Sequence, residues 1–331
     1  MKIFKRILKI LCWILIVCGI FTVFFYFKFS PTLNPTWGVN FSPNQAKYLG
    51  LNPKIVFSEM LLEIKPKKLR LMAYWEDVEE AKGKFNFSEM DLMLFQAEQA
   101  GAKVTLVIGH KQPRWPECHH PNWYNELSHT KQREALLVYI KATVKHFKSF
   151  SAIERWQVEN EPFFNFGPNC PVLNFNDLKE EVILVKSLDT RPVVITDSGE
   201  KGGWFSAARL SDIFGATMYR TVFHSRFNRY ITYPLPPVWY RVRAGMLEVF
   251  TSVKKVIGVE LQAEPWFEKD FYSASVSDQL KIMDINTLSN NINYAKNTGL
   301  PEHFLWGVEW WYFMKQNGHS EFWNKIRSLN N

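Results

Sequence analysis

Eight short apolar runs alternate along the chain with longer stretches whose apolar residues recur at steps of three or four. This alternation limits the possible folds more than any other property of the sequence. Runs of five to eight residues have the length of strands, whereas steps of three and four mark amphipathic helices. The apolar runs are WGVNF (37–41), KLRLMAY (68–74), AKVTLVIG (102–109), IERWQVEN (153–160), PVVITD (192–197), DIFGATMY (212–219), KVIGVELQ (255–262) and HFLWGVEW (303–310). The clearest helical stretches are 87–102, 131–147 and 277–299.

Strands that alternate with helices predict an α/β protein with a parallel sheet. Eight strand–helix units in about 300 residues match a (β/α)8 barrel, or TIM barrel, in number and length. A doubly wound sheet is the alternative, but no glycine-rich phosphate-binding turn follows any of the runs. There are no internal repeats, low-complexity tracts or second-domain linker, so we expect one barrel.

The N-terminal segment predicts a membrane anchor. Residues 10–27 form 18 uncharged positions after a basic start, which is long enough for a helix to cross a bilayer. A cleaved signal peptide is the alternative, but no small-x-small cleavage site follows the span. We therefore expect a basic tip and transmembrane helix over 1–30 and a catalytic domain over 31–331.

The distribution of charge bears on topology and on partners. Residues 1–30 hold five basic side chains and no acidic one, which predicts a cytoplasmic N-terminus and a single-pass protein whose domain lies outside the cytoplasm. The remaining chain carries 35 basic and 32 acidic residues, so its net charge is only +3. No basic stripe points to nucleic acid as a partner.

Two cysteines of the exported part are able to pair. Cys12 and Cys18 lie inside the apolar span, whereas Cys118 and Cys170 follow the third and fourth predicted strands. The loops after adjacent parallel strands lie side by side, so a disulfide between Cys118 and Cys170 is expected in an oxidising compartment. Two unrelated free thiols are the alternative.

Polar residues end or directly follow most of the apolar runs. In a barrel the carboxyl ends of all strands meet at one face, where such side chains converge on a common bowl. The residues are Asn40, His110, Glu161, Asp197, Tyr219, Glu260 and Glu309. Two carboxyl groups on opposite walls suit the cleavage of a glycosidic bond, which needs one acid to protonate the leaving oxygen and a second carboxylate at the anomeric carbon.

The segment RWQVENEPF (155–163) resembles the strand-4 Asn-Glu-Pro motif of the clan of retaining (β/α)8 glycoside hydrolases that includes cellulases, mannanases and β-galactosidases. The resemblance implies that Glu161 is the general acid/base and that Asn160 binds the sugar. GVELQAEPW (258–266) is similar to the strand-7 segment of some β-galactosidase-like members, which implies that Glu260 is the nucleophile.

Three further segments carry the same resemblance. YWEDVEEAKGKFNFSEMD (74–91) resembles the strand-2 loop of the clan, and FGATMYR (214–220) resembles the strand-6 segment that supplies a tyrosine, here Tyr219, near the nucleophile. Arg70 occupies a position where the clan often places an arginine against the nucleophile. Together these matches extend over 37–311.

Some assignments remain open on the sequence. Glu264 competes with Glu260 for the role of nucleophile, although it lies four residues on and before Pro265. We predict that Trp75 and Trp310 bind sugar faces, since the broad indole plane meets ring C–H groups while its N–H bonds a hydroxyl. His110 is predicted to bind substrate as well.

The predicted function is a membrane-anchored retaining glycoside hydrolase that cleaves β-glycosidic bonds of an oligo- or polysaccharide by double displacement. No zinc-binding spacing surrounds His119 and His120, so neither a metal nor a cofactor is expected. The alternative is a non-catalytic glycan-binding TIM barrel. A glycosyltransferase is disfavoured, because the body lacks an Asp-x-Asp motif.

Overall fold

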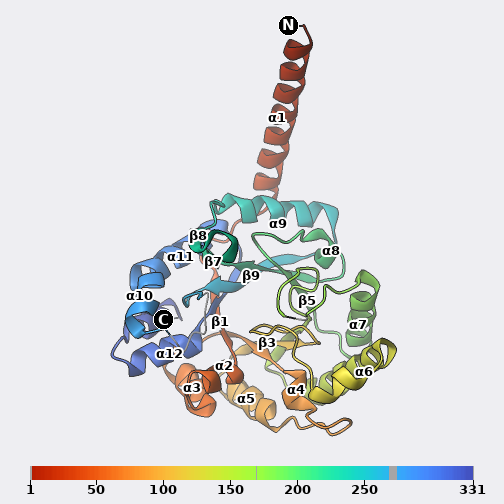
Figure 1. Cartoon of the computed structure of the whole chain (residues 1–331), viewed down its shortest axis with the longest axis vertical. Coiled ribbons are helices and arrows are strands. Elements are labelled where there is room, and N and C mark those ends of the chain that lie inside the picture. Colours follow the sequence, from red (N-terminus) through yellow and green to blue (C-terminus); the bar gives the residue numbers. More distant parts are fainter. Residues whose placement is uncertain (1, 169, 268–273, 331) are drawn as a thin grey trace.

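The centre of the molecule is a closed barrel of eight parallel strands (Figure 1). The computed structural model describes residues 2–168, 170–267 and 274–330. Around the barrel the order is β1, β2, β3, β4, β5, β6, β9, β10, and β10 pairs with β1 to close the ring. The strands are β1 Thr36–Phe41, β2 Lys68–Met72, β3 Lys103–Ile108, β4 Ile153–Val158, β5 Val193–Asp197, β6 Ile213–Met218, β9 Lys255–Gln262 and β10 Glu302–Trp306. The predicted (β/α)8 barrel is confirmed.

Helices surround the barrel as a ring in Figure 1. Their apolar faces pack inward as the spacing predicts; in α6, for example, Leu136, Ile140 and Val144 are buried. The elements outside the barrel are α2 Pro43–Tyr48, α3 Pro53–Glu59, the π-helical turn η1 Met60–Ile64, α4 Trp75–Val78, α5 Ser88–Gln99, the 3-10 turn η2 Asn122–Glu126, α6 His129–Phe147, α7 Phe175–Leu188, α8 Phe205–Ala208, α9 Val238–Phe250, α10 Val276–Ile282, α11 Ile285–Thr298, α12 Val308–Gln316 and α13 Glu321–Asn330.

Two of the predicted elements differ from the structure. The run 303–310 was expected to be one strand, but β10 ends at Trp306, and α12 begins at Val308. Gly307 makes this turn with a φ of 139°, a conformation that favours glycine. The stretch 277–299 is two helices, because Asp284 caps α11 by accepting a hydrogen bond from the Thr287 amide at 2.7 Å.

An antiparallel hairpin follows β6 and was not predicted. It consists of β7 Thr221–His224 and β8 Arg229–Thr232, joined by the 3-10 turn η3 Ser225–Phe227. Asn228 closes the turn with a φ of 48°, which asparagine tolerates better than most residues. The sequence signal was weak, because the two strands have only four residues each.

The interior of the barrel holds polar side chains in layers. Near the amino ends of the strands, Arg155 donates to Thr105 Oγ1 at 2.8 Å and forms an ion pair with Glu302. Nearer the carboxyl ends, Arg70 stands opposite Asn40 in the register of β1 and β2. This upper layer is the floor of the bowl in which the candidate site lies.

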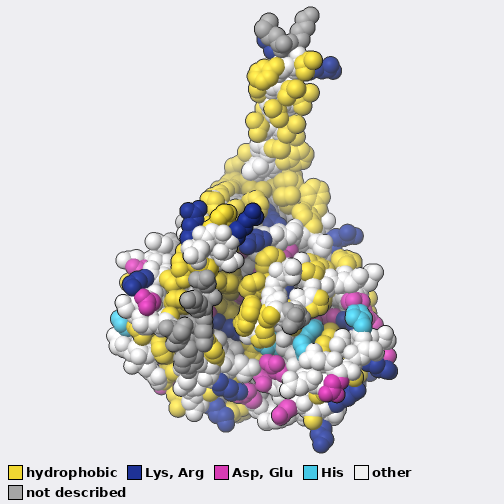
Figure 2. All heavy atoms as spheres, in the orientation of Figure 1, with side chains coloured by type: hydrophobic (Ala, Val, Ile, Leu, Met, Phe, Trp, Pro, Cys, Tyr) yellow, Lys and Arg dark blue, Asp and Glu magenta, His cyan; other side chains and the backbone are white. Residues whose placement is uncertain are grey.

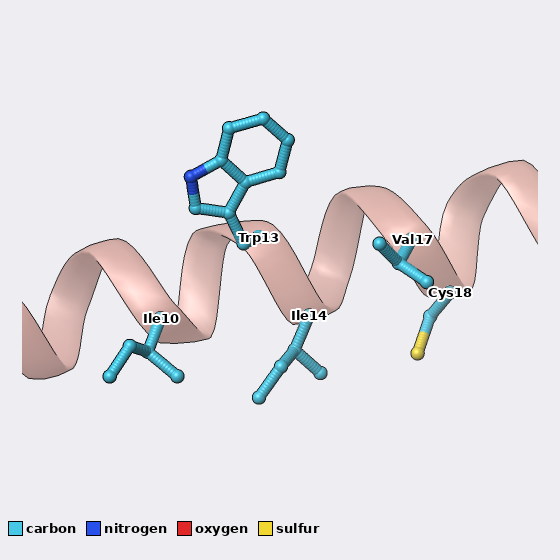
Figure 3. Close-up of a pocket in the computed structure, with 5 residues that line it drawn as sticks. All are labelled: Ile10, Trp13, Ile14, Val17 and Cys18. Atoms are coloured by element: carbon cyan, nitrogen blue, oxygen red, sulfur yellow. The ribbon is translucent and has the colours of Figure 1, made fainter.

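Helix α1 Lys2–Lys28 projects from the domain (Figures 1 and 2). Its basic residues lie in its first eight positions and at Lys28, and the stretch between them is uncharged. Among the described residues, one helix, Ile3–Lys28, is long and apolar enough to cross a membrane. Ile10, Trp13, Ile14, Val17 and Cys18 line a shallow apolar groove on its side (Figure 3). No other described element packs on this part of the helix, where the side chains are exposed.

The last turns of α1 pack on α9 of the barrel domain (Figure 1). The Phe25 and Phe250 rings lie 5.6 Å apart, and Arg241 Nε donates to the Tyr26 carbonyl at 3.0 Å. The backbones approach closely at Gly245, where a Cβ would meet the Phe25 carbonyl oxygen at 2.3 Å.

Candidate active site

Glu161 lies directly after β4, on the wall of the bowl. Its backbone takes a φ of 43°, which a glutamate rarely adopts and which turns the chain toward Pro162. The Glu161 amide donates to Thr196 Oγ1 at 2.8 Å, and its carboxyl accepts from Thr217 Oγ1 at 3.0 Å. No ion pair is made by this carboxyl within the described residues. Burial, followed by Glu260 and Glu117, raises the pKa of Glu161 well above its ordinary value of 4.5.

Glu260 faces the bowl from β9, beside Thr217 in the register of β6 and β9. Its Oε1 forms an ion pair with Arg70 Nη1 at 2.7 Å, and its Oε2 accepts from the Tyr219 hydroxyl at 2.8 Å. Thr217 of β6 also donates a hydrogen bond to the Glu161 carboxyl, so both glutamates lie beside this one residue. The carboxyl groups therefore share the bowl in different surroundings: one is paired with a cation and the other is not.

Arg70 is fully buried and fixed by four acceptors. Besides Glu260, its guanidinium donates to Asn40 Oδ1, to Gln157 Oε1 and to Asn160 Oδ1, at 3.0, 2.7 and 2.8 Å. A buried arginine held in this way cannot move away from the nucleophile candidate. The prediction that Arg70 lies against the carboxylate of the nucleophile candidate, here Glu260 of β9, is confirmed.

Asn160 and Tyr219 lie beside the two glutamates, as the motifs predicted. Asn160 Oδ1 accepts from Arg70 and from Thr196 Oγ1, at 2.8 and 3.1 Å, which leaves the amide group to donate. Burial and the adjacent Glu260 raise the pKa of Tyr219 well above 10, so this hydroxyl remains a hydrogen-bond donor. The structure thus brings Glu161, Glu260 and these two side chains into one constellation, although it assigns them no role.

Glu264 belongs to a different part of the bowl. It forms an ion pair with Arg114, whose Nη2 also contacts Glu309 Oε2 at 2.8 Å. The Arg114 guanidinium lies over the Trp306 ring, 4.0 Å from its centroid. Burial raises the pKa of Glu309 to about 6, although Arg114 opposes the shift. With Arg114 between them, Glu264 and Glu309 have the surroundings of a structural ion-pair network.

Trp75 and Trp310 are not available to a sugar, and their predicted role in binding substrate is wrong in this structure. Both side chains are fully buried. Trp75 stacks on Tyr139 with ring centroids 5.2 Å apart and donates to Glu79 Oε2 at 2.7 Å. Trp310 sits in α12 rather than in a strand, and its indole donates to Gln279 at 2.7 Å.

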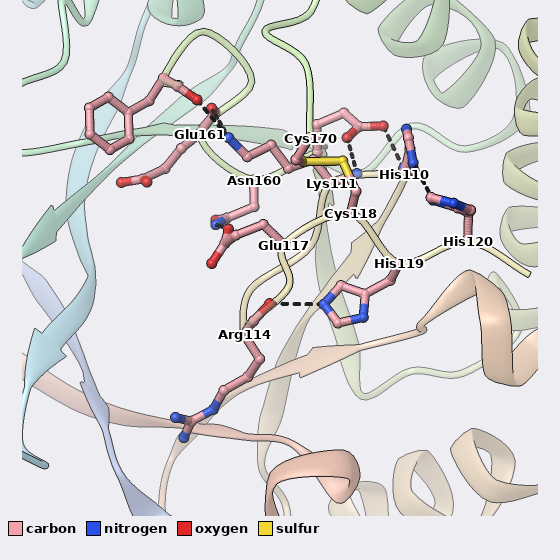
Figure 4. Close-up of a disulfide and its surroundings, with 12 residues drawn as sticks. His110, Lys111, Arg114, Glu117, Cys118, His119, His120, Asn160, Glu161 and Cys170 are labelled. Atoms are coloured by element: carbon pink, nitrogen blue, oxygen red, sulfur yellow. Dashed lines mark hydrogen bonds between the residues drawn. A yellow bond between two sulfur atoms is a disulfide. The ribbon is translucent and has the colours of Figure 1, made fainter. Parts of the chain in front are cut away.

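His110 also points away from the bowl, which corrects its predicted contact with substrate. Its Nε2 lies 2.8 Å from His120 Nδ1, and its ring packs on Tyr124. Burial and the neighbouring histidines lower the pKa of His110 to about 3. Figure 4 places His110 and His120 on one side of the loop after β3, whereas Glu161 lies on the other.

Aromatic side chains line the rim of the bowl in place of the predicted tryptophans. Trp266, in the loop after β9, lies 5.1 Å from the Tyr219 ring and 5.9 Å from Phe166. Phe166 in turn lies 6.0 Å from Trp115, which is 67% exposed. This row runs from Tyr219, which bonds Glu260, outward to solvent, so it offers apolar ring faces along one path into the bowl.

The loop after β3 carries functional candidates that were missed in the sequence: Lys111, Arg114 and Glu117 (Figure 4). The predicted disulfide is present and fixes this loop, since Cys118 and Cys170 are bonded with their Cα atoms 5.4 Å apart. Lys111 Nζ donates to the carbonyl groups of Glu161 and Phe164, at 3.2 and 2.7 Å. The one available signal was a glutamate beside a cysteine in PRWPECHH (113–120).

Glu117 is the third carboxyl group of the site. Its Oε2 accepts from Asn160 Nδ2 at 3.3 Å, and burial, with Glu260 as the largest charge effect, raises its pKa to about 8. Among residues 2–168, 170–267 and 274–330, no group of three or more metal-ligating side chains could hold an ion. The bowl presents carboxyl groups, the two arginines Arg70 and Arg114, and hydroxyl donors.

Comparison with known proteins agrees with this geometry. Residues 72–178, which include β3, β4 and Glu161, match the model of Glycosyl hydrolase family 10. A search of curated proteins finds no match to the chain.

Solved structures share the fold at low sequence identity. GH5_18 from Bifidobacterium longum subsp. longum ATCC 55813 is similar with a TM-score of 0.59 and 10% identity, over 82% of this chain and 69% of that one. The β-galactosidase from Rahnella sp. R3 has a TM-score of 0.60 and 13% identity, over 92% and 56% of the two chains. A GH10 endo-β-1,4-xylanase from Gloeophyllum trabeum has a TM-score of 0.54 and 16% identity, over 83% and 86%.

The fold and the arrangement of carboxyl groups thus define the class: this is a (β/α)8 barrel of the kind found in glycoside hydrolases. The resemblance to that clan, inferred from the motifs, is confirmed at this level by the family match and by the shared fold. The chain spans only a little over half of the Rahnella β-galactosidase.

Proposed function

We propose that this protein is a membrane-anchored retaining glycoside hydrolase that cleaves β-glycosidic bonds in an oligo- or polysaccharide. The observation that carries the proposal is the asymmetry of Glu161 and Glu260. Glu260 is paired with Arg70, whereas Glu161 has no cation and a raised pKa. The carboxylate of Glu260, held by a cation, has the properties of a nucleophile, and the carboxyl group of Glu161 has those of a proton donor.

The proposed reaction has two displacements. In the first, a Glu260 oxygen attacks the anomeric carbon while Glu161 transfers its proton to the leaving oxygen, so that an alcohol departs and a glycosyl ester of Glu260 forms. In the second, the Glu161 carboxylate takes a proton from a water molecule, whose oxygen attacks the same carbon and releases Glu260. The Tyr219 hydroxyl, 2.8 Å from Glu260 Oε2, orients the attacking carboxylate. No cofactor takes part in these steps.

Asn160 and the aromatic row are proposed to hold the substrate. The amide group of Asn160 is the donor closest in sequence to Glu161, and its oxygen is fixed by Arg70. The row of Trp266, Phe166 and Trp115 suits further sugar rings that extend toward solvent.

The location is proposed from α1. Residues 1–30 would form the cytoplasmic tip and membrane span, and residues 31–331 the catalytic domain on the outer side of the cell membrane. The exposed apolar surface of α1, its fixed contact with α9 and the Cys118–Cys170 disulfide all support an exported, anchored domain. The full-length protein should fractionate with membranes, and protease added to intact spheroplasts should digest the domain. A protected domain would contradict this orientation.

A screen of aryl β-glycosides and polysaccharides on the full-length protein in detergent tests the activity. We expect release of the aryl group or of reducing ends, with the β-configuration retained in the first product observed by NMR. The second candidate function is a non-catalytic glycan-binding barrel, favoured by the aromatic row alone. Binding of a glycan without turnover, unchanged in Glu161→Gln and Glu260→Gln, would support that candidate and contradict hydrolysis.

A further inference from the structure

Glu117 has no part in the double displacement, yet its side chain points into the catalytic bowl. Figure 4 shows Glu117, Asn160 and Glu161 directed to the same side of the loop, away from His110 and His120. Glu117 is 7% exposed, and its Oε1 has no hydrogen-bond partner among the described residues. A buried carboxyl group with an unused oxygen facing a ligand site is a candidate for ligand recognition.

The backbone holds Glu117 in this direction firmly. Its φ is 75°, a conformation that costs free energy for any residue other than glycine and that persists only when surrounding contacts impose it. The Glu117 amide donates to Arg114 O at 2.8 Å, and its carbonyl accepts from the Gln112 amide at 2.7 Å. Gly167 packs closely beneath, since a Cβ there would lie 2.9 Å from Glu117 Cβ. With the adjacent Cys118–Cys170 bond, these contacts fix the carboxyl group beside Asn160.

The charges of Lys111 and Arg70 lower the pKa of Glu117, although burial and Glu260 outweigh them. Arg70 is engaged by Glu260 and three neutral acceptors, and Lys111 donates to two backbone carbonyl groups. Neither cation forms an ion pair with Glu117 in the described structure. The charge of Glu260, on the other hand, raises the pKa of both Glu117 and Glu161, and Glu117 adds to the shift of Glu161. Three carboxyl groups thus face two cations, Arg70 and Lys111, and Glu117 is left without an ion pair, so this corner has room for a positive charge that a ligand brings.

The position of Glu117 indicates where on a sugar that charge would sit. The anomeric carbon must lie between Glu161 and Glu260, and it has two neighbours within the ring: the ring oxygen, which carries no hydrogen, and C2. Glu117 bonds Asn160, the residue next to Glu161, so a donor that reaches both side chains is best placed on C2. The C2 substituent is the nearest polar group to the reacting carbon.

We propose that Glu117 selects a β-linked 2-amino-2-deoxy sugar, such as a glucosamine residue without its acetyl group, by pairing its carboxylate with the C2 ammonium. This inference rests on the proposed hydrolase function and deepens it. A C2 hydroxyl would form a hydrogen bond but would bring no positive charge to Glu117. An N-acetyl group is uncharged as well, and it is bulkier, so it would be disfavoured.

Three 4-nitrophenyl β-glycosides, of 2-amino-2-deoxy-D-glucose, D-glucose and N-acetyl-D-glucosamine, test the selection on the full-length protein in detergent. The wild-type protein should have a kcat/KM for the amino sugar at least about 10²-fold above those for the other two, because only the ammonium brings a charge that compensates the buried carboxylate. Glu117→Gln should abolish this preference and act mainly through KM. Glu80→Gln, an exposed glutamate, is the matched control and should leave the preference intact.

Equilibrium binding separates this inference from the hydrolase function. Methyl 2-amino-2-deoxy-β-D-glucoside should bind the wild-type protein at least about 10²-fold more tightly than methyl β-D-glucoside by calorimetry, and Glu117→Gln should bind both alike. Tight binding of the amine without turnover of any glycoside would support Glu117 and contradict hydrolysis. Turnover of the glucoside or the N-acetyl glycoside at rates equal to that of the amino sugar would overturn the role of Glu117 and leave the hydrolase standing.

Discussion

Two groups of carboxyl residues share the bowl and differ in how their charge is compensated. The catalytic corner consists of Glu161, Glu260 and Glu117, and the arginine corner consists of Glu264 and Glu309 around Arg114. All five glutamates are buried. In the catalytic corner a single ion pair, Arg70 with Glu260, serves three carboxyl groups, whereas in the arginine corner Arg114 contacts both.

The consequence appears in the proton affinities. Burial acts on both corners, but the pKa of Glu117 rises to about 8, while that of Glu309, opposed by Arg114, rises only to about 6. Burial alone therefore does not separate a proton donor from a structural carboxylate. The separation comes from where the few cations lie, and that can be tested by removing carboxylates and cations one at a time.

The largest expected effect comes from replacing each of the two candidate nucleophiles, Glu260 and Glu264, in turn. Glu260→Gln should lower kcat by about 10⁴-fold or more, because the group that forms the covalent bond is lost. Glu264→Gln, in the arginine corner, should stay within about tenfold of the wild type. Azide should restore turnover in Glu260→Ala and give a glycosyl azide of inverted configuration. If Glu264→Gln is inactive while Glu260→Gln turns over, the assignment of the corners is reversed.

Glu161→Gln separates the proton donor from the nucleophile within the catalytic corner. On a 4-methoxyphenyl or oligosaccharide substrate, whose leaving group needs protonation, we expect a loss of about 10²–10⁴-fold in kcat/KM. On a 2,4-dinitrophenyl glycoside the first step needs no acid, so the loss should be much smaller, with a burst of dinitrophenol as the second step becomes limiting. Equal losses on both substrates would show that Glu161 is not the acid.

Removing the cation of the arginine corner should affect stability rather than chemistry. Arg114→Met leaves Glu264 and Glu309 buried without a cation and should lower the free energy of unfolding by about 3–5 kcal/mol, measured by urea denaturation with tryptophan fluorescence. Arg226→Met, at an exposed position, is the matched control. Adding Glu309→Gln to Arg114→Met should recover part of the loss. No loss in Arg114→Met would mean that this corner needs no cation.

The smallest effect is a difference in the pH dependence of stability. Glu117 in the unfolded chain releases its proton near the ordinary value of 4.5, but the folded protein keeps it to about 8, so the folded state binds more protons between these values. Its contribution to stability therefore falls as pH rises, by up to about 1.4 kcal/mol per pH unit. Glu200, whose pKa is raised to about 7, adds to this slope.

In the window from pH 6.5 to 8 both Glu117 and Glu200 release protons, so the contribution of Glu117 is the difference in slope between the wild type and Glu117→Gln. Below this window, His110 and His303, with pKa values lowered to about 3, change stability in the opposite direction. Within it, Glu309 has already released its proton. Thermal unfolding should become less dependent on pH in Glu117→Gln and keep its slope in Glu309→Gln. The same slope in both variants would contradict the difference between the corners.

Most of the barrel followed from the sequence, because hydrophobic periodicity is a local property. Each predicted run contains a strand, and the polar residues at the run ends lie at the barrel's carboxyl face, since parallel strands end together. Glu161, Glu260, Arg70, Asn160 and Tyr219 converge for that reason. The prediction of one strand over the eighth run is wrong beyond Trp306, because one continuous apolar stretch covers the end of β10, Gly307 and the start of α12.

What the sequence left open depends on contacts between segments distant along the chain. Trp75 and Trp310 look alike as binding or core residues until helix packing buries both. Glu264 and Glu260 differ by four positions, but only the tertiary structure puts Arg114 beside one and Arg70 beside the other. Glu117 could be recognised as part of the site only from the tertiary structure, because the loop after β3 places its carboxyl group against Asn160. Periodicity determines which face of an element is apolar, whereas the charge that a buried carboxyl group meets depends on which loops and strands are brought against it.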